Sequence, residues 1–213
     1  MQNTIKSLYY QMKGISYFVW IPFLVLYILL PAVHYTVYLQ ERDMEKVYVN
    51  IVGNVQILIP LFSVWYILFL LYHLVEQPGC EVLYVTETLK IQHILLLYLF
   101  YIIIMIPLFA GYSAFFSEFW WLYVKLCIVN LMYTMFVYAF TYLFRRIIPG
   151  ILMALFYTAI VSLRTTDGIG KISYFSFELK VGSELFQELI PIIVASLLFM
   201  IVGFVANAYF AKH

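Results

Sequence analysis

Long, unbroken runs of apolar residues alternate with short polar segments along this chain. Crossing a bilayer takes about 20 mainly apolar residues in a helix, but only about 10 residues of alternating character in a barrel strand. The runs here extend over 17 to 26 residues without alternation. The pattern therefore predicts an all-helical membrane protein with six transmembrane helices, at residues 15–39, 51–75, 91–116, 119–144, 147–163 and 189–210.

The first 14 residues show helical periodicity without a long apolar run. Ile5, Leu8, Tyr9 and Met12 recur at the spacing of one helix face, and the two lysines lie off that stripe. This pattern predicts an amphipathic helix at residues 1–14 that lies in the membrane interface, ahead of a transmembrane domain at residues 15–213.

The segment after the fifth span is neither a hydrophilic loop nor a span. The fifth run covers 17 residues, about 25 Å of helix, which is short for a hydrocarbon core of about 30 Å. Residues 164–188 then mix apolar and charged side chains. We expect a re-entrant helical segment in the outer leaflet; a folded surface loop packed on the helix ends is the alternative.

Basic residues near the span ends set the expected orientation, because Lys and Arg accumulate on the cytoplasmic side. With the N-terminus inside, six basic residues lie on the inner side and five on the outer side. The strongest single element is the Arg145–Arg146 pair directly after a span. We therefore expect a multi-pass protein of the plasma membrane with both termini in the cytoplasm.

Composition narrows the class of protein. Apolar residues make up 65% of the chain and charged residues 11%, whereas soluble domains average about 45–50% and about 25%. A soluble globule of 213 residues cannot bury that much apolar surface. The net charge of +1 gives no electrostatic basis for nucleic-acid binding. The expected surroundings are a lipid bilayer, and no nucleic-acid partner is expected.

Catalytic and metal-binding patterns are absent from the sequence. No two of the four histidines share a predicted helix face, Cys80 and Cys127 form no C-x-x-C motif, and no phosphate-binding loop is present. All eleven acidic residues fall outside the predicted spans. We expect no catalytic residue, no metal and no cofactor in this chain, and an intramembrane enzyme is the least favoured class.

Two polar residues lie inside the fourth span. Lys125 is one to two turns from its start, and we expect its side chain to extend to the outer interface near Trp121. The alternative is a role in a substrate path. Asn130 lies deeper, and an interhelical hydrogen bond is favoured over contact with a substrate.

Small residues recur at four-residue spacing along the fifth span. They are Gly150, Ala154, Thr158 and Ser162. Helices in lipid associate by close backbone approach, which small residues permit. The stripe predicts a packing surface, either within one subunit or between two subunits.

The loop at residues 76–90 carries the most distinctive pattern. Pro78 and Gly79 end the second helix. Glu81 then opens a short helical segment that closes near Lys90, an arrangement that suits the helix dipole. Leu83 and Tyr84 are apolar residues on this inner segment. The pattern predicts a cytoplasmic docking element for a soluble partner.

This loop resembles the inner loop of ABC-2-type transporter permeases. The matching residues, which with Tyr84 and Glu87 form the expected docking surface, are Glu76, Gly79, Glu81, Leu83, Thr86 and Lys90. The resemblance also covers the layout of the chain, namely an N-terminal interfacial helix, six spans, and a re-entrant segment between the last two. It implies a coupling helix that contacts a separate ABC ATPase subunit, with ATP and Mg²⁺ bound by that partner.

The resemblance implies the permease subunit of an ATP-driven exporter that works by alternating access. Two permeases, either two copies of this chain or one copy and a paralogue, would form the path. The aromatic, charge-poor interior favours a hydrophobic or amphipathic cargo, and the resemblance to the family makes a peptide the first choice. The alternative function is a non-transport membrane protein, such as a peptide-immunity or assembly factor.

Overall fold

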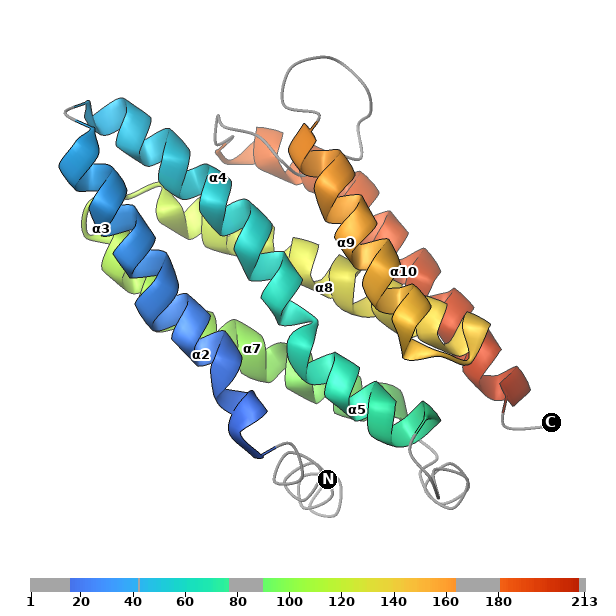
Figure 1. The fold of residues 1–213 in the computed structure, drawn as a ribbon. Helices are drawn as coiled ribbons and strands as arrows, with labels where there is room; N and C mark the ends of the chain where they lie inside the picture. Colours follow the sequence, from blue (N-terminus) through green and yellow to red (C-terminus); the bar gives the residue numbers. More distant parts are fainter. Residues whose placement is uncertain (1–15, 42, 77–89, 164–180, 211–213) are drawn as a thin grey trace.

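The structure, a computed structural model, describes residues 16–41, 43–76, 90–163 and 181–210 (Figure 1). These residues form helices and turns, without strands. The elements in chain order are η1 (Ser16–Trp20, a 3-10 helix), α2 (Ile21–Leu24), η2 (Val25–Leu29, a π-helix), α3 (Leu30–Gln40), α4 (Met44–Ser63), α5 (Trp65–Val75), α7 (Lys90–Ser113), α8 (Phe119–Phe144), α9 (Ile147–Leu163) and α10 (Ser183–Phe210).

Helical segments long and apolar enough to cross a membrane make up most of the described chain. They are five, at Tyr17–Gln40, Met44–Val75, Ile91–Ser113, Phe119–Phe144 and Ser183–Tyr209. The sixth predicted span, α9, is apolar but has only 17 residues, which is the lower limit of the range of about 17–25 residues for a helix that crosses a bilayer. The prediction of an all-helical chain with several helices apolar enough to cross a membrane is confirmed for the described residues, whereas the count of six spans is not. The predicted helix at residues 1–14 lies outside the described residues.

The second spanning segment begins earlier than predicted and is bent. α4 starts at Met44, seven residues before the predicted span, because Asp43 caps it by accepting a hydrogen bond from the Glu45 amide at 3.0 Å. Pro60 lies inside α4 and lacks the amide hydrogen that would bond the carbonyl of Gln56. α4 ends one turn later at Ser63, and the chain continues as α5 after Val64. Ser63 donates to the Pro60 carbonyl at 2.7 Å, which satisfies one acceptor at the break.

The last helix also begins earlier than predicted. α10 starts at Ser183 and not at residue 189. The end of the predicted re-entrant segment, residues 183–188, is therefore continuous with the final helix. Residues 164–180 of that segment lie outside the described residues.

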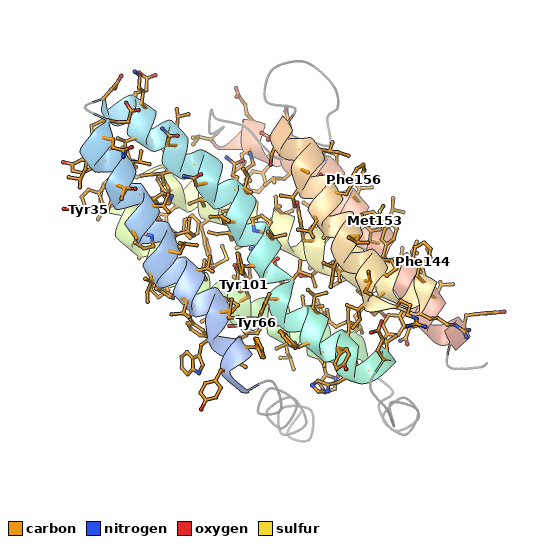
Figure 2. The ribbon with its side chains drawn as sticks, in the orientation of Figure 1. Tyr35, Tyr66, Tyr101, Phe144, Met153 and Phe156 are labelled. Atoms are coloured by element: carbon orange, nitrogen blue, oxygen red, sulfur yellow. The ribbon has the colours of Figure 1, made fainter. Side chains whose placement is uncertain are left out.

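α8 is the centre of the bundle. It packs against α4, α5 and α7 on one side and against α9 and α10 on the other, as its position between them in Figure 1 shows. In contrast, α9 and α10 expose large apolar side chains such as Phe156 and Met153, which point away from the bundle in Figure 2. An apolar outer face around a packed interior is the arrangement expected of helices in lipid.

Several tyrosines join helices from within the bundle. Tyr66 and Tyr101 are fully buried and lie inside the bundle in Figure 2. Tyr66 donates to the Val19 carbonyl at 3.0 Å, and Tyr101 donates to the Ile59 carbonyl at 2.9 Å. The ring supplies packing and the hydroxyl finds an acceptor, so a tyrosine is favourable even in an apolar interior.

The small-residue stripe on α9 packs against α8 of the same chain. A Cβ atom on Gly150 would lie 2.9 Å from Thr141 Oγ1 and 3.1 Å from the Val137 carbonyl. Ala154 is buried, and the Thr158 hydroxyl lies 2.7 Å from the Tyr133 hydroxyl. Of the two alternatives for the stripe, packing within one subunit is the one observed for these three residues. The fourth, Ser162, is partly buried and donates to the Thr158 carbonyl at 2.8 Å.

Gly203 marks the closest approach of α10 to α8. A Cβ atom there would lie 2.4 Å from the buried Tyr138 ring and 3.2 Å from the Ala139 Cα. Gly203→Ala should therefore lower the free energy of unfolding by about 1–3 kcal/mol, as other overpacked sites do. Gly111→Ala is the matched control, because nothing lies within 4 Å of its added Cβ. Unfolding in mixed micelles measures both, and equal stabilities would contradict the close α8–α10 packing.

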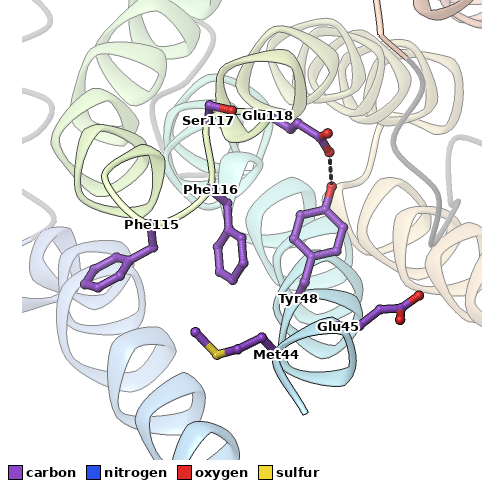
Figure 3. A pocket seen from close by; sticks show the side chains of 7 residues that line it. All are labelled: Met44, Glu45, Tyr48, Phe115, Phe116, Ser117 and Glu118. Atoms are coloured by element: carbon purple, nitrogen blue, oxygen red, sulfur yellow. Dashed lines mark hydrogen bonds between the residues drawn. The ribbon is translucent and has the colours of Figure 1, made fainter.

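At the end of the bundle that carries the α3–α4 turn, α4 contacts the turn between α7 and α8. The Tyr48 hydroxyl donates to Glu118 Oε2 at 3.1 Å (Figure 3). The Tyr48 ring also packs on Phe116 and Phe119, with ring centroids 5.3 and 5.8 Å apart. This contact fixes the start of α8 relative to α4.

Candidate functional site

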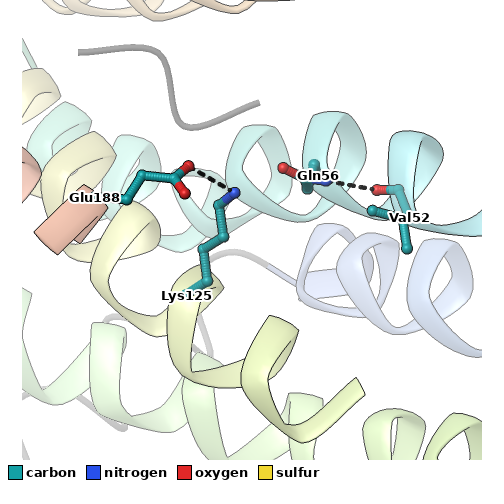
Figure 4. Close-up of polar contacts among 4 residues, drawn as sticks. All are labelled: Val52, Gln56, Lys125 and Glu188. Carbon is teal, nitrogen blue, oxygen red and sulfur yellow. Dashed lines mark hydrogen bonds and ion pairs between the residues drawn. The ribbon is translucent and has the colours of Figure 1, made fainter. Parts of the chain in front are cut away.

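A buried ion pair lies between α8 and α10. Lys125 Nζ is 3.1 Å from Glu188 Oε1, and the two side chains are only 1% and 13% exposed (Figure 4). The expectation that Lys125 extends to the outer interface is therefore wrong. Its ammonium turns into the bundle because a carboxylate on a neighbouring helix compensates the charge there.

The early start of α10 places Glu188 in this pair. Glu188 is the sixth residue of α10 and follows Leu185 on its buried side. The expectation that every acidic residue lies outside the helices that cross the membrane is wrong for Glu188. A sequence signal for it exists: Gly182, Ser183 and Glu184 read as a helix start, which would have moved Glu188 into the second turn.

Gln56 on α4 is a third polar side chain in this part of the bundle, and with Lys125 and Glu188 it forms what we call the polar centre. It is fully buried, and its Nε2 donates to the Val52 carbonyl at 3.3 Å. In Figure 4 the Gln56 side chain extends toward the side of the bundle where the Lys125 ammonium lies, and α4 packs directly on α8. Sequence reasoning did not single out Gln56. The sequence does contain a signal for this residue, because Gln56 is a polar amide within a long apolar run.

These three side chains give the bundle interior a defined chemistry. An ammonium and a carboxylate in low-dielectric surroundings attract each other strongly, and each is costly to leave without the other. The α8–α10 contact is therefore stable when the pair is closed. It can open only if another polar or charged group replaces one member of the pair.

Asn130 lies apart from this centre. It is fully buried on α8, and its Nδ2 contacts Met105 Sδ of α7 at 3.3 Å. This is the interhelical contact expected from the sequence. Lys125 and Asn130 are the two candidate path residues. Lys125 pairs with Glu188 on α10, whereas Asn130 contacts Met105 on α7.

The expected docking surface is described only at its two ends. Glu76 follows α5, and its Oε1 accepts a hydrogen bond from the Ile147 amide, the first residue of α9, at 2.8 Å. Lys90 is the first residue of α7. The other predicted docking residues lie outside the described residues; they are Gly79, Glu81, Leu83, Tyr84, Thr86 and Glu87.

The Glu76 contact has a clear physical basis. The first amides of a helix have no partner within it, and its N-terminus carries a partial positive charge. A carboxylate there is favourable. Arg145, in the left-handed region at φ 55°, ends α8 and turns the chain so that α9 can start beside α5. The residue that follows α5 and the start of α9 are therefore joined.

Among the described residues, no group of three or more His, Cys, Asp or Glu side chains is placed to hold a metal ion. Cys127 is a partly buried free thiol on α8. The described chemistry is that of ion pairing and hydrogen bonding between helices.

Comparison with protein-family profiles, characterised proteins and solved structures finds no match to this chain.

Proposed function

We propose that this chain is the permease subunit of an ATP-driven exporter of the ABC-2 type. The segment at residues 76–90 would dock a cytoplasmic ABC ATPase, which binds ATP and Mg²⁺. The observation that carries the proposal is the hydrogen bond from the Ile147 amide to Glu76. It connects the first residue of the proposed docking segment to the start of a helix in the bundle.

The proposed transmission of movement follows the contacts of α9. A displacement of the docking segment by the ATPase would act on α9 through Glu76. α9 packs on α8 along its small residues, so α8 would move with it. α8 is joined to α10 by the Lys125–Glu188 pair. α5, which Glu76 follows, finishes at the end of the bundle opposite to the start of α10, which carries Glu188 (Figure 1). A movement at one end would therefore have a route to the other, as alternating access needs.

The proposed assembly contains two permeases, either two copies of this chain or this chain and a paralogue. The α9 stripe is occupied by α8, so a second permease would contact another face. The proposed cargo is hydrophobic or amphipathic, because the interior of the bundle is aromatic and poor in charge; a peptide is favoured by the resemblance to ABC-2 permeases. The plasma membrane and cytoplasmic termini belong to the same proposal.

Side-specific labelling tests the orientation on which docking depends. In a Cys127→Ser background, Cys80 should react with an impermeant maleimide only from the cytoplasmic side. In a chain without either native cysteine, a cysteine introduced by Asp43→Cys at the opposite end should react only from outside. Labelling of Cys80 from outside would contradict both the orientation and the docking site, and would favour the non-transport alternative.

A further inference from the structure

A groove of about 540 Å³ lies between the last turns of α8 and α10. The two helices pack directly on each other and finish at the same end of the bundle (Figure 1). The α10 residues in the groove recur at the spacing of one helix face; they are Ile201, Val202, Val205, Ala206 and Tyr209. The volume falls within the range of small-molecule sites, about 300–1,000 Å³.

The α10 side of the groove is apolar and faces outward. Ile201, Val205 and Tyr209 are exposed, and they belong to a helix that is long and apolar enough to cross a membrane. Tyr209 lies in the last turn of α10, and an aromatic ring with a polar tip is favourable at a membrane interface. The groove therefore extends along the spanning helix to its interfacial end.

Arg145 supplies positive charge at that end of the groove. It lines the groove, and both it and the adjacent Arg146 are exposed. The described lining contains no acidic residue. Glu76, which contacts this turn, is outside the groove and accepts a hydrogen bond from the Ile147 amide at 2.8 Å. The groove therefore joins an apolar face to a site with excess positive charge.

The sequence around the groove has the same sign of charge. No acidic residue occurs at residues 119–163 or 189–213, and Lys212 is two residues beyond the end of α10. The ends of the two helices contribute only partial negative charges. One carbonyl at the end of α8, that of Thr141, already accepts from the Arg145 and Arg146 amides. The full charges of the two guanidinium groups therefore outweigh the partial charges of the helix ends.

We infer that the groove binds an anionic phospholipid. The headgroup phosphate pairs with Arg145, and an acyl chain lies along the apolar face of α10. A guanidinium matches a phosphate bidentately, and basic pockets between spanning helices are suited to anionic headgroups. A second copy of this chain is a poorer occupant, because a symmetric contact would bring the same arginines of both copies together. The inference does not rest on the permease proposal, because it uses neither the docking segment nor the cargo.

Native mass spectrometry of the intact protein, released from a neutral detergent, measures the binding of single lipids. Palmitoyl-oleoyl phosphatidylglycerol and palmitoyl-oleoyl phosphatidylcholine are the matched probes, because they have the same acyl chains and only the second carries a compensating ammonium. The first phosphatidylglycerol should bind at least about fivefold more tightly than the first phosphatidylcholine, which corresponds to about 1 kcal/mol. Equal affinities would overturn the inference.

Two variants test the two halves of the site. Arg145→Gln combined with Arg146→Gln should remove the preference for phosphatidylglycerol, whereas Lys46→Gln, at an exposed lysine on α4, should preserve it. Val205→Trp should fill the groove and weaken phosphatidylglycerol binding about tenfold, or about 1.4 kcal/mol. Val194→Trp is the control, because it changes another exposed valine of α10 outside the groove. Circular dichroism and a monodisperse elution profile establish that each variant is folded.

The groove is excluded as the lipid site by either of two results. One is an unchanged preference for phosphatidylglycerol in the folded double arginine variant, and the other is unchanged binding in a folded Val205→Trp protein. Light scattering tests a second copy as the occupant: the mass of the protein should be the same with and without Val205→Trp. A dimer that this substitution dissociates would show that another copy covers the groove, and would overturn the inference.

Discussion

Lys125→Met should lower the free energy of unfolding by about 3–5 kcal/mol, the cost typical of breaking a buried ion pair by removing one partner. Lys125 is 1% exposed and Glu188 is 13% exposed, so water cannot readily replace the ammonium. The substitution keeps the length of the side chain, and the loss therefore reports the charge and not a cavity. Unfolding in mixed micelles, followed by circular dichroism, measures it.

Two further variants interpret this result. Lys46→Met is the matched control at an exposed lysine on α4 and should change stability by less than about 0.5 kcal/mol. Lys125→Met combined with Glu188→Leu should recover most of the lost stability, because neither charge is then buried alone. Equal effects of Lys125→Met and Lys46→Met would contradict the buried pair. In that case the stability of the double variant could not be interpreted as recovery from an unpaired buried charge.

Leu83→Ala combined with Tyr84→Ala should weaken ATPase assembly tenfold or more, which corresponds to at least about 1.4 kcal/mol. Apolar anchors at interfaces commonly cost about 1–4 kcal/mol when truncated. Both residues belong to the polar segment between two predicted spans in the sequence, so insertion of the chain should be unchanged. Co-purification of the ATPase with tagged chain from native membranes gives the measurement.

The control for this variant is a Leu and Tyr pair at the opposite end. Tyr35 and Leu39 on α3 are exposed by 63% and 64%, and their combined replacement by Ala should leave the ATPase bound. Loss of the ATPase in the control would point to a general effect on the bundle. Full retention in Leu83→Ala/Tyr84→Ala would move the docking site away from the loop.

The apolar runs predict the limits of a helix well where the helix is apolar along its whole length. α8 and α9 have the predicted bounds of 119–144 and 147–163. α4 and α10 extend beyond the runs, because a capping residue and polar first turns continue each helix toward its start. The sequence alone predicts loops for those first turns, because they contain polar and charged residues.

The candidate site was harder to predict for a related reason. The periodicity of one helix reports which face is polar, but not which residue on another helix lies opposite. Lys125 and Glu188 are 63 positions apart and meet only because α10 packs along α8. With Glu188 assigned to a loop, an interfacial Lys125 was the better expectation. The hydrogen bond between Glu76 and Ile147 is a long-range contact of the same kind.

The proposed function requires that the segment at residues 76–90 docks a cytoplasmic ATPase. A photo-crosslinking amino acid in place of Tyr84, activated in native membranes, tests this claim most directly. We expect a covalent adduct between this chain and a soluble protein that carries a P-loop, and no such adduct when the same group replaces Tyr35 on α3. An adduct at position 84 only with lipid, or only with another copy of this chain, would contradict it.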